Sequence, residues 1–140
     1  MKYGVTIAIE PLNRKESNVI NTVAEALELA EELDLPGIQV LADAYHMYLE
    51  REPLEIISRA VKAGRLAHVH YAEFDRSFPV GQADNGVDFA QLFTLLQEAG
   101  YTGGISAECS SKQIAVDSEE SLSYISRIWN EVQARSSSLN

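Results

Sequence analysis

Short runs of apolar, β-branched residues alternate along the chain with longer segments whose apolar positions recur every three or four residues. The short runs have the length of buried strands and lie at 5–10, 38–43, 66–73 and 103–108. The helical pattern is clearest at 20–30, 54–61, 89–96 and 122–132. Strand–helix units in series predict a parallel sheet with right-handed crossovers. Four such units are half of an eight-stranded (β/α)8 barrel.

Residues that favour the start or the end of a helix agree with this division into strands and helices. Thr22 and Glu25 have the spacing of a capping box at the first helix. Residues typical of helix starts and ends flank the next two helices, namely Pro53, Gly64, Asp88 and Gly100. We therefore predict one α/β domain over 1–140, a half TIM barrel, with a frayed tail at about 134–140.

Composition narrows the possible partners. The chain has 140 residues, 46% hydrophobic and 23% charged, as in a globular domain. Its formal charge of −10, with no cluster of basic residues, argues against duplex nucleic acid as a partner. There is no apolar run of membrane-spanning length. The single cysteine, Cys109, excludes an intrachain disulfide and favours a reducing, cytoplasmic location.

Each predicted strand ends on, or passes through, a side chain that can bind a metal ion. These residues are Glu10, Asp43, His70 and Glu108, and they recur at intervals close to the roughly 31 residues of one barrel unit. The carboxyl ends of parallel strands form the rim where α/β proteins bind ligands. Three carboxylates converging there would repel one another unless a cation neutralised them. Mixed oxygen and nitrogen ligands favour Mn²⁺, Mg²⁺ or Co²⁺ over a sulfur-rich structural zinc site.

Each candidate also has an interpretation without a metal ion. The two glutamates would then be ordinary loop acids, and Asp43 a helix N-cap or turn residue beside a surface His46. His68 and His70 share one face of their strand, so either could be the ligand. His68 lies one pleat deeper, which favours a hydrogen-bonded core histidine.

Four segments together resemble the C-terminal half of the ketose 3-epimerase family, in sequence order and spacing: IEPLNRKE, DAYHMYLE, HVHYAEFDR and GYTGGISAE. That family includes the D-tagatose and D-psicose 3-epimerases and belongs to the xylose isomerase-like TIM-barrel sugar isomerases. The resemblance implies that Glu10, Asp43, His70 and Glu108 bind the metal, most simply Mn²⁺. It also implies that Glu10 and Glu108 act as the acid/base pair. Three further positions match substrate contacts of the family, namely Glu16, His46 and Arg76.

The resemblance implies an isomerase that moves a proton next to a ketose carbonyl through an enediolate. An alternative is a half barrel of this family that binds metal without turnover. A minor alternative is an enzyme like the DNA-repair endonuclease IV, but its multi-zinc site needs more histidines than the three present. The two edge strands, 5–10 and 103–108, would be bare, and apolar side chains such as Val40 and Val69 would be open to water. We therefore expect a homodimer or higher oligomer that completes the barrel.

Overall fold

A computed structural model describes residues 3–81 and 86–138. Its centre is a parallel sheet in the order β1 (Ile7–Ile9), β2 (Ile38–Asp43), β3 (Leu66–Tyr71) and β4 (Gly104–Ala107). Each strand follows its predecessor along the chain and pairs with it, so the sheet is wound in one direction, as in a barrel wall. The predicted α/β fold and half-barrel architecture are confirmed.

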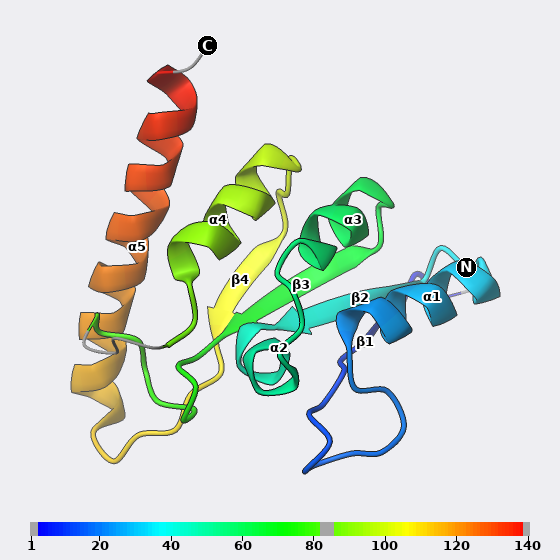
Figure 1. Cartoon of the computed structure of the whole chain (residues 1–140), viewed down its shortest axis with the longest axis horizontal. Coiled ribbons are helices and arrows are strands. Elements are labelled where there is room, and N and C mark those ends of the chain that lie inside the picture. Colours follow the sequence, from blue (N-terminus) through cyan, green and yellow to red (C-terminus); the bar gives the residue numbers. More distant parts are fainter. Residues whose placement is uncertain (1–2, 82–85, 139–140) are drawn as a thin grey trace.

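Within the described residues, five helices connect or follow the strands, and Figure 1 shows α1, α3, α4 and α5 in succession along the sheet. Their bounds are Val23–Leu33 (α1), Ala44–Glu50 (α2), Ile56–Lys62 (α3), Phe89–Glu98 (α4) and Ile114–Ser138 (α5). The capping box of Thr22 and Glu25 is present at α1, and the Asp88 side chain caps α4. In the described part of the chain, no helix is long and apolar enough to span a membrane.

Two features differ from the sequence-based expectations. Helix α2 was expected only under the interpretation of Asp43 as a helix N-cap, because residues 44–50 come directly after a strand with no linker between the two elements. Helix α5 continues to Ser138, through most of the segment expected to be a frayed tail. Val132 is buried near its end, and the Ser136 hydroxyl donates to the Val132 carbonyl. Residues 139–140 of that segment lie outside the described part.

The core lies between the sheet and the helices. Val40 and Val69 are fully buried there with Leu27, Ile57 and Phe93, so the expectation that these two valines are open to water is wrong. Because side chains alternate along a strand, the other face of the sheet carries Leu41 and His68, both half-buried. The described helices thus cover one face, and the second face is more polar than expected.

Candidate metal centre

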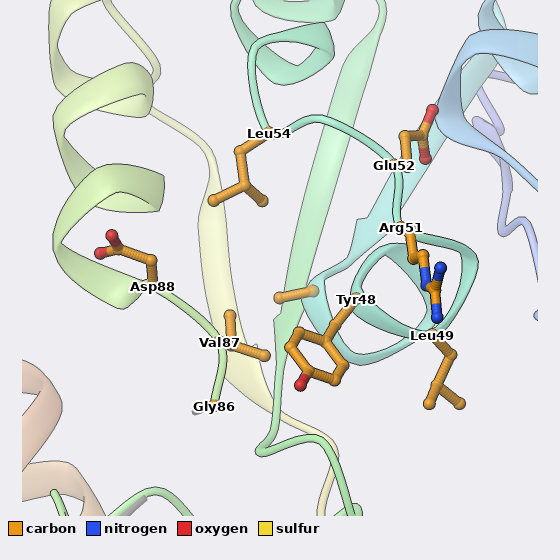
Figure 2. Close-up of a pocket in the computed structure, with 9 residues that line it drawn as sticks. Tyr48, Leu49, Arg51, Glu52, Leu54, Gly86, Val87 and Asp88 are labelled. Atoms are coloured by element: carbon orange, nitrogen blue, oxygen red, sulfur yellow. The ribbon is translucent and has the colours of Figure 1, made fainter. Parts of the chain in front are cut away.

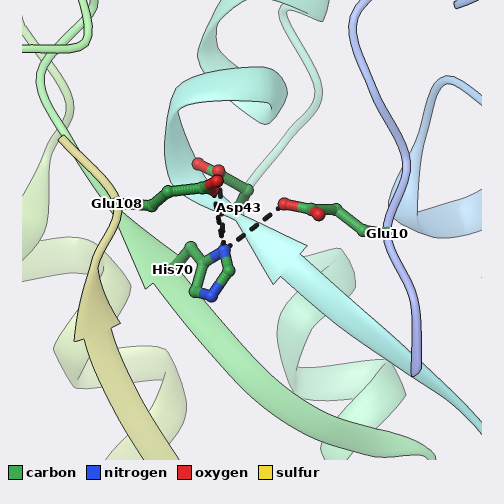
Figure 3. A group of neighbouring side chains, drawn as sticks. All are labelled: Glu10, Asp43, His70 and Glu108. Carbon is green, nitrogen blue, oxygen red and sulfur yellow. Dashed lines mark hydrogen bonds and ion pairs between the residues drawn. The ribbon is translucent and has the colours of Figure 1, made fainter. Parts of the chain in front are cut away.

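The sheet brings four side chains together at one edge (Figure 3). Glu10 directly follows β1, Asp43 is the last residue of β2, His70 lies in β3, and Glu108 directly follows β4. Asp43 and His70 are register partners in neighbouring strands. Each of the four offers one ligand atom, and these atoms all lie within 4.8 Å of one another. The arrangement follows from the parallel sheet, which places the carboxyl ends of successive strands side by side.

His70 lies at the middle of this acidic cluster, by which we mean Glu10, Asp43, His70 and Glu108. Its Nδ1 atom is 2.9 Å from Glu108 Oε2, 3.3 Å from Glu10 Oε1 and 3.9 Å from Asp43 Oδ2. Figure 3 shows the Glu108 side chain entering the cluster from the left of the view and Glu10 from the right, with both carboxylates on the Nδ1 side of the imidazole. Three carboxylate oxygens therefore surround one nitrogen in a space small enough for one cation.

Asp43 has two roles at once. Its Oδ1 accepts a hydrogen bond from Tyr45 N at 2.9 Å and so caps the N-terminus of α2. Its Oδ2 belongs to the acidic cluster. The side chain is buried, and each of its oxygens has a partner: Oδ1 at the N-terminus of α2 and Oδ2 in the acidic cluster. The interpretation of Asp43 as a helix N-cap is therefore confirmed, and it does not exclude a metal-binding role.

Arg76 supplies positive charge to the cluster. Its guanidinium lies 2.5 Å from both Asp43 Oδ2 and Glu108 Oε2, and 4.6 Å from the centre of the Tyr45 ring. Burial lowers the pKa of Arg76, but its hydrogen bonds and charge interactions with the two carboxylates outweigh burial and raise that pKa overall. With His70 neutral, three carboxylates and one guanidinium leave two excess negative charges. A divalent cation would balance them, so the donor set fits such an ion.

His68 lies in β3 two residues before His70, on the same face of the strand. Its Nε2 lies 2.7 Å from the Ser106 hydroxyl, and its ring centre is 5.1 Å from that of His70. Burial, and then the neighbouring His70, lower the pKa of His68. His68 is thus hydrogen-bonded, as predicted, but it is half-buried on the sheet face opposite the core and is not a core histidine. His70 is the histidine that the structure places among the carboxylates.

Glu16 and His46 are linked to each other through a residue that the sequence analysis did not single out. Asn13 Nδ2 lies 2.6 Å from Glu16 Oε1 and 2.9 Å from His46 Nδ1. His46 is 2% exposed, so its interpretation as a surface histidine is wrong. Asn13 is equally buried and stands between Glu10 and Glu16 in the loop after β1. The sequence signal that could have identified Asn13 is its position, because it is a polar residue in a loop at the rim where ligands bind.

A pocket of about 580 Å³, whose lining residues Figure 2 shows, has no member of the acidic cluster in its lining. Tyr48, Leu54 and Val87 are among the side chains that line it. None of the residues predicted to bind metal or substrate lines this pocket, so it adds no chemistry to the candidate site.

The sequence matches the family model described as xylose isomerase-like TIM barrel over residues 1–128. It is 34% identical to an L-ribulose 3-epimerase of Mesorhizobium japonicum over 131 residues, which are 94% of this chain and 42% of that protein. It is 33% identical to a ketose 3-epimerase of Arthrobacter globiformis, covering 90% of this chain and 43% of that protein. The chain thus spans about two fifths of the length of these curated relatives.

Solved structures show the same relationship. An L-ribulose 3-epimerase superposes with a TM-score of 0.80 at 25% identity, over 98% of this chain and 51% of that one. The 3-keto-D-glucoside 4-epimerase of E. coli superposes with a TM-score of 0.76 at 31% identity, over 90% of this chain and 47% of that one. The resemblance to half of a ketose 3-epimerase barrel, noted from the sequence motifs, is confirmed.

Proposed function

Because the chain belongs to the xylose isomerase-like TIM barrel family, we propose that its acidic cluster binds one divalent metal ion and serves the epimerisation of a ketose. The observation that carries this proposal is the convergence of three carboxylates and one imidazole within 4.8 Å at the strand ends. Relatives named as sugar epimerases support the class of substrate.

Glu10, Asp43, His70 and Glu108 would hold the metal, and Mn²⁺ is the ion we favour, with Mg²⁺ or Co²⁺ as alternatives. All four residues offer oxygen or nitrogen atoms, which these ions accept. When bound, the ion would polarise the ketose carbonyl and so acidify the neighbouring C–H bond. Arg76 neutralises part of the negative charge of the cluster, which lowers the repulsion among its three adjacent carboxylates.

Glu10 and Glu108 are the proposed acid/base pair. They follow the two edge strands, β1 and β4, and both carboxylates reach Nδ1 of His70 (Figure 3). One carboxylate would remove the proton next to the carbonyl, which gives an enediolate, and the other would return a proton to the opposite face. This sequence inverts the carbon. Return of the proton to the adjacent carbon would instead make the reaction an aldose–ketose isomerisation.

Glu16, His46 and Arg76 are the proposed substrate contacts. Arg76 is fixed by two carboxylates and by the Tyr45 ring, and His46 is held by Asn13. Side chains held in this way need little ordering when a sugar binds, which favours tight and specific contacts with its hydroxyl groups.

A second half barrel would have to cover the sheet face that carries Leu41 and His68, opposite the described helices. We propose that a second copy of the chain supplies it, because the chain matches about half of each solved barrel and each edge strand has a neighbour on one side only among the described residues. The same observation favours a second candidate function, a half barrel that binds metal without turnover.

Proton exchange with solvent tests the proposed chemistry. The protein would be incubated with Mn²⁺ and ketoses in deuterated water, and we expect deuterium in both substrate and product. Glu10→Gln and Glu108→Gln should each lose most of the rate, because a neutral amide cannot accept the proton. Glu28→Gln, an exposed site on α1, is the matched control. Turnover without deuterium uptake would contradict the acid/base roles, and bound Mn²⁺ with no turnover on any ketose would favour the non-catalytic function.

A further inference from the structure

Asn13 joins two of the proposed substrate contacts into one unit. Its side chain is 1% exposed, and its amide nitrogen lies 2.9 Å from His46 Nδ1 and 2.6 Å from Glu16 Oε1. Its amide oxygen accepts from Lys15 N at 3.1 Å. Its backbone N–H donates to the same His46 nitrogen at 3.2 Å. Every polar atom of the Asn13 side chain therefore has a partner within the loop after β1 or on α2.

These contacts determine the orientation of the Asn13 amide. The reverse orientation would place Oδ1 against a Glu16 carboxylate oxygen and Nδ2 against the Lys15 N–H, two unfavourable contacts between like groups. With Nδ2 facing His46, both groups that reach Nδ1 are hydrogen-bond donors. Nδ1 must then offer a lone pair, so the proton of the neutral imidazole lies on Nε2.

We propose that Asn13 is a positioning residue that holds His46 in the Nε2–H tautomer and fixes Glu16 beside it. The inference deepens the proposed function and rests on it for the identity of the ligand. In this unit His46 Nε2–H can only donate a hydrogen bond, and the second oxygen of Glu16 can only accept one. A donor and an acceptor held together suit a hydroxyl group, which both accepts and donates, and so suit a polyhydroxy sugar.

The tautomer can be measured directly by nitrogen NMR on the full chain with ¹⁵N-labelled histidine at pH 8. The chain has three histidines, so His68 and His70 serve as internal references. We expect His46 as a single Nε2–H tautomer, whereas an unconstrained neutral imidazole exchanges between two. A His46 that carries its proton on Nδ1 would overturn the proposal.

Asn13→Asp tests the side chain itself. A carboxylate in place of the amide would accept from Nδ1, so His46 Nδ1 should gain a proton while the other histidine signals stay in place. Asn18→Asp adds the same charge at an exposed position of the same loop and should leave His46 unchanged. If Asn13→Asp leaves the His46 tautomer unaltered, the backbone N–H alone sets it and the assigned role of the side chain is wrong.

A kinetic measurement separates this inference from the proposed function. Asn13→Ala should raise KM for the ketose about tenfold, the effect of one lost hydrogen bond, and leave Mn²⁺ affinity unchanged. An unchanged KM in an active enzyme would overturn the positioning role. Absence of turnover in the unaltered protein would overturn the catalytic function instead, and the NMR result would still decide the tautomer.

Discussion

Arg76 Nη1 lies 2.5 Å from Asp43 Oδ2, the same oxygen that the acidic cluster would offer to a metal ion. The backbone of Arg76 has a φ of 68°, a conformation that residues other than glycine adopt infrequently. The turn that produces it is held by Arg76 N donating to Glu73 O and by Ser110 N donating to Arg76 O. The chain thus places a guanidinium where it neutralises the carboxylates and would compete with the proposed cation for them.

Arg76→Gln should therefore lower the stability of the metal-free protein and raise its affinity for a metal ion. Loss of the guanidinium leaves the two carboxylates without their charged partner, which should lower the free energy of unfolding by more than about 1 kcal/mol. Removal of a positive charge at this distance should tighten Mn²⁺ binding about tenfold. Melting temperatures with and without Mn²⁺ test both effects, because ligand binding to the native state raises stability.

The control for this prediction is Arg59→Gln, which removes an exposed ion pair with Glu31 on the helix side of the molecule. That pair should contribute less than about 1 kcal/mol and should not affect Mn²⁺ binding. Weaker Mn²⁺ binding by Arg76→Gln than by the unaltered protein would contradict a competing role for Arg76.

Asp43→Asn should remove most metal affinity and keep the helix cap. The asparagine oxygen can still accept from Tyr45 N, but the cluster loses one negative charge and one strong oxygen donor. We expect Mn²⁺ affinity measured by calorimetry to fall by about 100-fold or more, since loss of even an outer-shell partner of a metal ligand costs about 10- to 100-fold.

Asp88→Asn provides a matched control, because Asp88 caps α4 in the same way and lies outside the acidic cluster. The Mn²⁺ affinity of the Asp88→Asn variant should equal that of the unaltered chain. Equal Mn²⁺ binding by Asp43→Asn and the unaltered chain would show that the cluster is not the metal site.

The sequence pattern predicted most of the fold, because the residues that favour each strand and helix also agree with the parallel sheet that these elements form. The bounds of β2 were predicted correctly, since β-branched and apolar residues end there on an aspartate that caps the next helix. The sequence also predicted that the strand ends lie together at one rim, because all strands of a parallel sheet have their carboxyl ends at the same edge. The face on which Val40 packs was not predicted, because a run that is apolar on both faces does not reveal which side meets the helices.

The contacts that organise the site were less accessible from the sequence. Arg76 meets Asp43 across 33 residues, and Asn13 meets His46 across the same separation. Such pairs depend on the turn after β3 and the loop after β1, whose conformations no periodicity encodes. Sequence spacing therefore identified the candidate metal ligands but missed Asn13, which holds the proposed substrate contacts His46 and Glu16.

Glu73 should make stability depend on pH. This glutamate is 7% exposed, and its Oε2 has no hydrogen-bond partner among the described residues. Burial raises the pKa of Glu73 above the ordinary 4.5, and the nearby Asp75 adds to the increase despite a hydrogen bond from the Val87 backbone. The native state then binds this proton more tightly than the unfolded chain, so the free energy of unfolding should fall as pH rises above about 4.5.

Glu73→Gln removes this ionisation and should gain stability relative to the unaltered chain as pH rises from 4.5 towards neutrality. Denaturant unfolding at a series of pH values measures the difference, and Glu32→Gln, on the exposed side of α1, serves as the control. A difference between Glu73→Gln and the unaltered chain that is the same at every pH would show that Glu73 titrates alike in the native and unfolded states.

Strands β1 and β4 each have one neighbour in the described sheet, and Ile7 on β1 is 58% exposed. Unpaired parallel edges favour association, and closure of β4 of one copy on β1 of the other would bury them. A formal charge of −10 on each chain opposes this approach.

We therefore expect a homodimer or higher oligomer whose association strengthens as salt screens the charge. Light scattering at micromolar concentration and rising ionic strength would measure it. Ala8→Arg places a long charged side chain on the exposed part of β1 and should shift the equilibrium towards monomer, whereas Ala115→Arg on α5 should not. A monodisperse monomer at all salt concentrations would contradict closure by a second copy.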